Sequence, residues 1–197
     1  PNYLFIDLQI SNSTLPGTFK IEFNKGQKKL THNYKIENRR NLSQQNEGFD
    51  SSDVIYLITP DRFANGDYSN DIIKGLKENK IDRKDNYARH GGDIIGVTQN
   101  MNYIKEMGFT SIWLNPVLIN DMKEGSYHGY ATTDYYTPDP RFGSMDDYLE
   151  FSEKASKNGI KLIKDIIVNH CGLYHWWMDD LPFNDWLNFQ EIYLKSN

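Results

Sequence analysis

A carboxylate, an amide and an imidazole close an otherwise apolar stretch in the second half of the chain. The stretch is Asp165-Ile-Ile-Val-Asn169-His170, in which only the first residue and the last two are polar. Side chains alternate along a strand, so Asp165 and Asn169 would lie on the same side, with Asp165 deeper and Asn169 at the rim. His170 would stand at the mouth and donate to a bound group. An Asn-His pair in this place can equally well close a turn.

An earlier stretch combines two ring side chains with a carboxylate. It is His128-Gly-Tyr130-Ala-Thr-Thr-Asp134. Tyrosine and tryptophan offer a flat apolar face with a polar edge, which suits contact with a sugar ring. The same residues also suit a packed loop aromatic and a solvated histidine. Trp176 and Trp177 present the same choice, and for them we favour packing against the fold over sugar contact.

Oxygen-bearing side chains cluster in a third stretch, Asn65-Gly-Asp67-Tyr-Ser-Asn70-Asp71, and another aspartate follows in Gly91-Gly-Asp93. Calcium takes about six to eight oxygens from carboxylates, amides and backbone carbonyls. The cluster is not an EF-hand, because the twelfth position counted from Asn65 is Leu76 and not glutamate. A simple turn is the alternative, since Asn, Gly and Asp are the usual turn residues.

Charge and hydropathy argue against two classes of partner. Residues 1–48 hold seven Lys or Arg and four Asp or Glu, a net charge of +3, whereas residues 49–197 hold 15 and 23, a net charge of −8. An acidic main body argues against nucleic acid. No apolar run approaches the roughly 20 residues that span a bilayer, and the first residues show no signal-peptide pattern. The single cysteine, Cys171, excludes an internal disulfide and a cysteine-based zinc site.

The candidate residues follow apolar runs that predict buried strands. These runs cover 54–58, 110–117 and 160–168 and are nearly continuous, as in strands covered on both faces. Between them, 96–108 has apolar residues at helical spacing, and 144–159 predicts a helix with Ser144 as its N-cap. The order β-α-β-α-β indicates parallel strands with helical crossovers, whose carboxyl ends carry the ligand-binding residues.

Two architectures satisfy this order, a doubly wound sheet and a (β/α)8 barrel. No G-x-G-x-x-G follows a strand, which weakens the nucleotide-binding form. Ahead of these elements, three strands are predicted at 3–10, 18–23 and 29–37, as a small antiparallel unit. The polar residues 38–52 are predicted to be a linker.

Four ordered motifs give the chain a specific resemblance. They are VIYLITPDRFANGD, HGGDIIGVTQNMNYIKEMGFTSIWLNPV, YHGYATTDYYTPDPRFGS and NHCGLYHWW. Together with DIIVNH they resemble the α-amylase family of glycoside hydrolases, and in particular its neopullulanase and cyclomaltodextrinase branch. The resemblance is strong over 53–190 and extends loosely to 1–40.

The resemblance implies an α/β fold built from the first three β/α units of a (β/α)8 TIM barrel. Residues 1–45 would be the C-terminal part of an N-terminal domain, the last strands of an immunoglobulin-like β-sandwich. Residues 46–197 would be the N-terminal part of the catalytic barrel, truncated after strand three. Because three strands do not close a barrel, we expect partner strands from the missing remainder of the barrel or from another copy of the chain.

The resemblance also implies roles for the polar residues. Tyr130 would stack on the sugar at the point of cleavage, His128 and His170 would hydrogen-bond sugar hydroxyls, and Asp134 would support the same loop. Asp165 and Asn169 would be structural residues at the active site. In the family Asp165 pairs with an arginine on strand four, which this chain lacks, and a buried carboxylate without a partner is costly or protonated.

A Ca²⁺ loop near the first strand is a further implication of the resemblance. Its ligands would be the carbonyl group of Gly91 and the side chains of Asn65, Asp67, Asn70, Asp71 and Asp93.

The implied activity of the parent protein is retaining hydrolysis of α-1,4-glucans, maltodextrins or cyclodextrins. Such enzymes need a carboxyl nucleophile and a carboxyl acid/base, which follow strands four and five in the family. No G-F-R-x-D motif occurs here, so we expect no catalytic residue in this chain, which would be inactive alone. Its contribution would be part of the α-glucan cleft and the calcium loop.

Two alternatives to an enzyme fragment remain at this point. One is a non-catalytic carbohydrate-binding or interaction module on a truncated barrel. The other is a doubly wound α/β domain unrelated to sugars. The sequence encodes no localisation, although related sugar-scavenging enzymes are often periplasmic.

Overall fold

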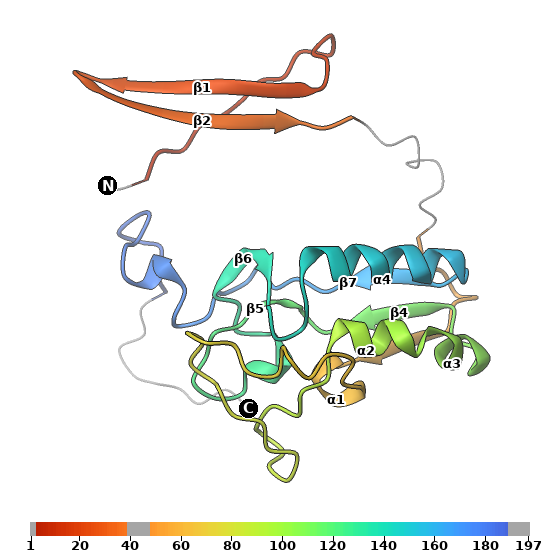
Figure 1. The fold of residues 1–197 in the computed structure, drawn as a ribbon. Coiled ribbons are helices and arrows are strands. Elements are labelled where there is room, and N and C mark those ends of the chain that lie inside the picture. Colours follow the sequence, from red (N-terminus) through yellow and green to blue (C-terminus); the bar gives the residue numbers. More distant parts are fainter. Residues whose placement is uncertain (1–2, 39–47, 189–197) are drawn as a thin grey trace. The chain divides into compact units, whose positions relative to one another are not determined.

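The computed structural model describes residues 3–38 and 48–188. The chain divides into two compact units, one running to Gly48 and one starting at Phe49. Figure 1 shows the helices and strands of both units along the chain. No helix within the described ranges is long and apolar enough to cross a membrane.

The first unit contains an antiparallel hairpin of β1 (Gly17–Lys25) and β2 (Lys28–Ile36). Gly26 adopts a φ of 59° in the two-residue turn, as tight hairpin turns require. The register pairs Phe19 with Tyr34 and Phe23 with Leu30, which gives the hairpin one apolar face. The strands predicted at 18–23 and 29–37 are therefore confirmed.

The strand predicted at 3–10 is wrong. Residues 3–10 form no strand in the structure, and Leu4 and Leu8 are 70% and 46% exposed. A partly alternating pattern shows which residues suit a strand, but a strand forms only where a neighbour satisfies its backbone groups. Most of the predicted linker, 39–47, lies outside the described residues.

The second unit is built on parallel strands, as the sequence predicts. Within the described residues β3 (Ile55–Ile58), β4 (Ser111–Leu114) and β7 (Lys161–Lys164) form a sheet in the order β3-β4-β7, with both pairs parallel. A second, antiparallel pair joins β5 (Leu118–Ile119) to β6 (Asp134–Pro138). This pair lies in the long connection between β4 (Ser111–Leu114) and the helix at Met145–Lys157.

The helices bury one face of the parallel sheet. They are α1 (Pro60–Phe63), α2 (Ile94–Gln99), α3 (Met101–Glu106) and α4 (Met145–Lys157). The shared core combines sheet residues such as Ile58 and Ile112 with helix residues such as Val97, Ile104 and Phe151. Burial of such side chains contributes about 1.5–3 kcal/mol each and is the main source of the unit's stability.

The opposite sheet face keeps apolar side chains in contact with solvent. Ile55, Leu57 and Trp113 are 38%, 52% and 37% exposed. Apolar surface gathered on one face is typical of a site that another segment or molecule covers. The expectation of partner strands stays a prediction.

The helix predicted at 96–108 is interrupted. It begins earlier, at Ile94, and divides at Asn100 into α2 and α3. The Asn100 side chain donates to the Gly96 carbonyl oxygen at 2.8 Å, so it occupies an acceptor of the helical ladder. Asparagine competes in this way with backbone hydrogen bonds, and it therefore favours helix ends. Apolar spacing alone does not reveal such a break.

Helix α4 follows its predicted form closely. The Ser144 hydroxyl accepts from the Asp147 backbone N–H, and the Asp147 carboxylate accepts from the Ser144 backbone N–H, which makes a capping box. Asp146 and Asp147 lie in the first turn, where negative charge is favourable. Gly159 follows the end of the helix with a φ of 72°.

The strands are shorter at their carboxyl ends than their apolar runs predict. β4 ends at Leu114 and β7 at Lys164, so Asn115, Asp165 and Asn169 all follow the sheet. The alternation of the strand still continues in part beyond β7, because Asp165 is half-buried and Ile166 is exposed. Asp165 lies deeper than the exposed Asn169, as predicted.

Asp53 fastens the amino ends of the three parallel strands. Its carboxylate accepts from the Thr110 hydroxyl at 2.7 Å, ahead of β4, and from Lys161 Nζ at 2.9 Å, at the start of β7. Asp53 itself precedes β3, and the Thr110 hydroxyl accepts from the Val54 backbone N–H. These hydrogen bonds, with the Lys161 bond as the largest cause, lower the pKa of Asp53 from 3.8 to about 2.

Arg141 orders the excursions at the opposite, carboxyl edge. Its fully buried guanidinium makes two hydrogen bonds to the Asp139 carboxylate, at 2.9 and 2.7 Å. It also donates to the carbonyl oxygens of Glu78 and Asn120, at 3.1 and 3.0 Å. Burial opposes ionisation of Asp139, but Arg141 outweighs it and keeps the pKa of that carboxyl below its ordinary value. Paired charges of this kind are costly to break singly.

We predict that Asp53→Asn removes a pH-dependent part of the stability. The carboxyl of Asp53 has a lower pKa when folded than its ordinary value of 3.8, so its contribution is complete above about pH 4 and is lost as the pH falls towards about 2. The melting temperature of the variant should be lower at pH 7 and should fall less between pH 4 and 2. Glu150→Gln, an exposed change on α4, is the control. Equal acid dependence in both variants would contradict the role of Asp53.

Candidate functional site

The carboxyl edge of the sheet brings the predicted sugar-contact residues together. Asp165 Oδ2 accepts from the Tyr130 hydroxyl and from Trp113 Nε1, both at 3.0 Å. Trp113 belongs to β4 and Asp165 follows β7, so the loop that carries Tyr130 is fixed to two neighbouring strands. Burial and the bond to Asp165 raise the pKa of Tyr130.

The expectation of an Asp165 carboxylate without a partner is therefore wrong. The side chain is half-buried and accepts two hydrogen bonds from groups that are 35 and 52 residues away in sequence. An ionised carboxylate has about four acceptor positions, so two donors satisfy it only in part. The remaining capacity is available to a further donor.

His128 and Tyr130 form one rigid pair of rings. The rings lie 5.8 Å apart at an interplanar angle of 24°, and the Tyr130 backbone N–H donates to His128 Nδ1 at 2.9 Å. Because Nδ1 accepts, Nε2 carries the proton in the neutral ring. Burial lowers the pKa of His128, which favours this neutral form. His128 is the last residue of the short helix η2 (Ser126–His128).

His170 joins this group from the segment after β7. Its Nε2 lies 2.9 Å from the Tyr130 carbonyl oxygen, and its own carbonyl oxygen accepts from the Tyr135 hydroxyl at 2.6 Å. The Asn169 amide lies 3.4 Å from His170 Nδ1. Gly172 permits this approach, because a Cβ there would lie 2.3 Å from the Ala131 carbonyl oxygen.

Asp134 is placed apart from the ring pair. It begins β6, and its carboxylate accepts from the Tyr136 backbone N–H at 2.8 Å. Burial lowers the pKa of His175, and the negative charge of Asp134 raises it by a smaller amount. Asp134 thus bonds within its own strand and makes no hydrogen bond to Tyr130 among the described contacts, and its role as a support of the Tyr130 loop stays a prediction.

The two neighbouring tryptophans for which packing was predicted, Trp176 and Trp177, have different surroundings. Trp177 is half-buried and forms a three-ring cluster with His175 and Tyr135, at centroid distances of 4.2 and 6.2 Å, while His175 and Tyr135 lie 5.7 Å from each other. Trp176 covers the other side of His175 at 4.0 Å and is 43% exposed. Both lie in the short helix η3 (Trp176–Met178), and the packing interpretation suits Trp177 best.

Several residues of the site were not predicted. Trp113, Asn115 and Tyr135 contact the predicted residues, and Asn115 donates to the His128 carbonyl oxygen at 3.4 Å. Like Asp165, Asn115 is a polar residue within the last part of an otherwise apolar run, so the same signal could have found it. Nothing in the local sequence distinguishes Trp113 or Tyr135 from core aromatics.

The predicted metal ligands fall into two groups. Asn65 Nδ2 donates to Asp71 Oδ1 at 2.7 Å, and Gly91 lies against both side chains. A Cβ on Gly91 would be 2.6 Å from Asp71 Oδ1 and 2.9 Å from Asn65 Nδ2, and the φ of Gly91 is 87°. Asn65, Asp71 and Gly91 are therefore brought together from separate parts of the excursion.

Asp93 serves mainly as a helix cap. Its buried carboxylate accepts from the backbone N–H groups of Gly66, Asp67 and Gly96, the last of which belongs to α2. Asn70 Nδ2 lies 3.4 Å from the same carboxylate. The Asp67 carboxylate accepts from the backbone and hydroxyl of Ser69, which lowers its pKa.

Two oxygen atoms of this loop have no hydrogen-bond partner in the described part of the chain. They are Asn65 Oδ1 and Asn70 Oδ1, both buried. Buried polar atoms are normally satisfied, so orphaned amide oxygens point to a missing donor or cation. The described residues contain no group of three or more His, Cys, Asp or Glu side chains placed to hold a metal. A donor set made of amide, carboxylate and backbone carbonyl oxygens fits Ca²⁺ better than a transition metal.

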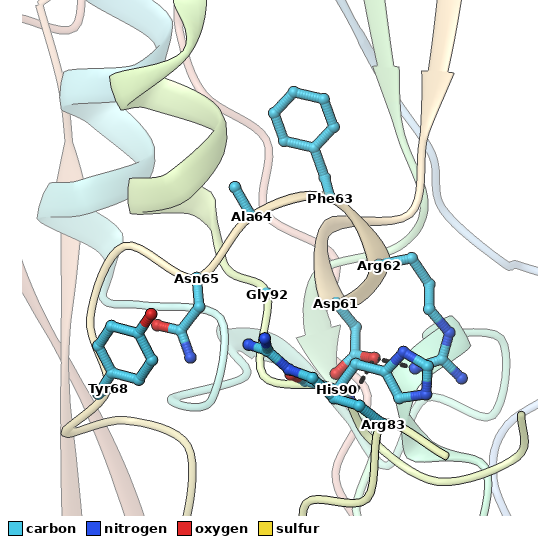
Figure 2. Close-up of a pocket in the computed structure, with 9 residues that line it drawn as sticks. All are labelled: Asp61, Arg62, Phe63, Ala64, Asn65, Tyr68, Arg83, His90 and Gly92. Carbon is cyan, nitrogen blue, oxygen red and sulfur yellow. Dashed lines mark hydrogen bonds and ion pairs between the residues drawn. The ribbon is translucent and has the colours of Figure 1, made fainter. Parts of the chain in front are cut away.

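A polar hollow of about 250 Å³ lies beside this loop (Figure 2). Asp61, Arg62, Arg83 and His90 line it together with Asn65. The buried Asp61 carboxylate bonds to Arg62 and accepts the backbone N–H groups of His90 and Gly91, the first at 2.8 Å. Asp61, which lies in α1 shortly after β3, thus holds the backbone at His90 and Gly91 close to the end of that strand.

Comparison with known proteins connects this arrangement to carbohydrate enzymes. A model of the α-amylase catalytic domain matches residues 57–191, and a model of the cyclomaltodextrinase N-terminal domain matches residues 1–40. The chain is 43% identical over 122 residues to a β/α-amylase of Paenibacillus polymyxa, covering 62% of this chain and 10% of that protein. It is 36% identical to a cyclomaltodextrinase of Thermoanaerobacter pseudethanolicus, covering 73% and 25%.

A solved structure shows the same likeness. The Anoxybacillus α-amylase superposes with a TM-score of 0.59 at 42% identity, over 65% of this chain and 26% of that chain. The chain thus spans between about a tenth and a quarter of the length of these relatives.

We predict that Gly91→Ala disturbs the oxygen-rich loop beyond ordinary backbone strain. Gly108 has the same φ of 87°, but a Cβ there would meet nothing within 4 Å, so Gly108→Ala reports the strain alone. That strain costs about 1–2 kcal/mol. The free energy of unfolding, from urea titrations of both variants, should fall further for Gly91→Ala because Asp71 and Asn65 must move. Equal losses would show that the contacts around Gly91 contribute nothing.

Proposed function

Because the chain belongs to the α-amylase family, whose TIM-barrel glycoside hydrolases are its structural neighbours, we propose that it is part of an enzyme acting on α-1,4-linked glucans. The substrates would be maltodextrins or cyclodextrins, and the reaction would be hydrolysis with retention. This part would supply one side of the sugar-binding cleft and a calcium loop. Its residues 46–197 would be the first three β/α units of the barrel, and residues 1–45 the end of a β-sandwich.

The convergence of His128, Tyr130 and His170 at the carboxyl edge is the observation that carries this proposal. In parallel α/β folds ligands bind at that edge. A sugar ring presents an apolar face and a hydroxyl rim, which match a tyrosine face bordered by imidazole groups. Tyr130 is held from its hydroxyl, its backbone N–H and its carbonyl group, so the ring is oriented before any ligand arrives.

Each residue of the group has a distinct task in the proposed site. Tyr130 stacks on the sugar, and Asp165 orients it through the phenol hydroxyl. His128 is in its neutral form, with Nε2–H as a hydroxyl donor. His170 holds the Tyr130 loop and borders the sugar, while Asn169 and Asp134 maintain the surrounding backbone. The chemistry of bond cleavage needs a nucleophile and an acid/base from outside this chain.

Calcium would have a structural task in the same protein. The donors would be the orphaned amide oxygens of Asn65 and Asn70, the Asp71 carboxylate and the Gly91 carbonyl group, with Asp67 beside them. A bound cation would neutralise the Asp71 carboxylate and coordinate the amide oxygens, so it would hold the loop that follows α1 in place. Asp93 would act indirectly, by capping α2 and holding the loop backbone.

Sugar binding gives the direct test of the site. We expect the chain to bind maltose and expect Tyr130→Ala to weaken binding about tenfold, since loss of one ring contact costs about 1–1.5 kcal/mol. Tyr136→Ala, at an exposed tyrosine six residues away, should leave the affinity unchanged. Affinity is measured by changes in the nuclear magnetic resonance spectrum during titration. No release of reducing sugar by the same samples is expected, and measurable turnover would contradict the assignment of the catalytic groups elsewhere.

Calcium binding is tested by calorimetric titration of the chain after removal of metal with a chelator. Asp71→Asn should lower the affinity for Ca²⁺ at least tenfold, because it removes the only carboxylate of the proposed set that contacts Asn65 among the described residues. Asp82→Asn lies in the same excursion, where its partners are Lys80 and Lys84, and it should bind Ca²⁺ like the wild type. Equal affinity in the two variants would exclude this donor set.

A further inference from the structure

The short helix η2 carries His128 as its last residue but does not hold its own shape. Gly125 and Gly129 flank it, and neither has a side chain that could cap an end of the helix. A helical turn this short fixes several backbone dihedrals for about one hydrogen bond, so it is unstable by itself. Contacts from other segments therefore determine where η2 and the His128 ring lie.

Glu78 supplies the cap that η2 lacks. Its Oε2 accepts from the Ser126 backbone N–H at 2.8 Å, across 48 residues of sequence. Asn120 holds the other end of the same peptide unit, because its Nδ2 donates to the Ser126 carbonyl oxygen at 3.1 Å. Ser126 and Asn120 are fully buried, and Glu78 is 8% exposed. In such surroundings a hydrogen bond to a carboxylate is strong, since little water competes for either group.

The backbone of Glu78 is fixed by the buried charges around Arg141. The Arg141 guanidinium donates to the Glu78 carbonyl oxygen at 3.1 Å and pairs with the Asp139 carboxylate at 2.7 Å. A buried side chain on a fixed backbone has already lost its rotamer freedom during folding. Glu78 therefore holds η2 before any ligand binds, and this order lowers the entropy lost on binding.

The charge of Glu78 also reaches the His128 ring. Burial lowers the pKa of His128, and the negative charge of Glu78 opposes this effect in part. Tyr127 and Tyr130 are the titratable rings that lie against His128, at centroid distances of 5.4 and 5.8 Å. Removal of the Glu78 charge is thus measurable at His128 in the absence of a sugar.

We propose that Glu78 is a positioning residue of the sugar site, which it serves without contact to the sugar. Through Ser126 it sets the orientation of η2. The helix in turn places the His128 ring against Tyr130 and leaves the Nε2–H of His128 for a sugar hydroxyl. This assignment rests on the proposed function, but the link from Glu78 to His128 is measurable independently of it.

The first test follows the pKa of His128 by nuclear magnetic resonance, without sugar. Glu78→Gln removes the charge and keeps an amide oxygen that accepts from Ser126, so the pKa of His128 should fall below that of the wild type. Glu124→Gln removes an exposed charge four residues from His128 and should leave that pKa unchanged. An equal pKa of His128 in the wild type and in Glu78→Gln would overturn the assignment.

The second test measures maltose affinity at pH 7 in two variants of Glu78. Loss of the cap in Glu78→Ala should weaken binding about fivefold, whereas Glu78→Gln should stay within about twofold of the wild type. The nuclear Overhauser contact between the His128 and Tyr130 rings should be lost in Glu78→Ala and kept in Glu78→Gln. Full affinity together with an unchanged ring contact in Glu78→Ala would contradict the positioning role.

The two tests separate this assignment from the proposed function. If the wild type and Glu78→Ala bind maltose equally well, the positioning role is excluded and the proposed function stands. If the wild type does not bind maltose, the proposed function fails, and the pKa of His128 with the ring contact still confirms or overturns the link to Glu78. If Glu78→Ala does not fold, the comparison of Glu78→Gln with Glu124→Gln decides the matter.

Discussion

The Asp53 carboxylate is the constraint on which the placement of the site depends. It holds the amino ends of β4 and β7 through Thr110 and Lys161, and Asp53 itself lies just before β3. The strands are parallel and short, so fixing one end also determines where the other ends lie. The polar residues that follow β4 and β7 therefore emerge at the same edge. This separation of a stabilising edge from a ligand-binding edge is the general design of β/α barrels.

Buried ionic and polar contacts then order the long connections at the carboxyl edge of the sheet. Arg141 joins segments that are 21 and 63 residues away in sequence, and Asp61 and Asp93 accept the backbone N–H groups of returning loops. The buried carboxylates of Asp61, Asp93 and Asp139 thus support the architecture. Among the buried side-chain atoms that lack a hydrogen-bond partner in the described residues, the oxygens of Asn65 and Asn70 lie beside the Asp71 carboxylate and the Asp93 carboxylate, and this placement suggests a cation.

The candidate sugar site depends on orientation more than on charge. Tyr130 is fixed by three hydrogen bonds, and His128 and His170 border it with imidazole groups. A neutral ligand gains little from charged partners, since their desolvation is costly, whereas pre-oriented rings and donors lower the entropy lost on binding. The acidic main body of the chain is therefore compatible with a neutral carbohydrate ligand.

The sequence by itself determined the alternation of parallel strands and helices among β3, β4 and β7, the cap at Ser144 and the polar strand ends, because these follow from local spacing and from contacts within a few residues. Only the tertiary structure decided that β7 stops at Lys164 and that the Asp93 carboxylate also accepts the backbone N–H groups of Gly66 and Asp67. It also decided the partners of Asp165, which lie 35 and 52 residues away. Hydrogen-bond partners so distant are selected by packing of the whole unit, and no local pattern records that selection.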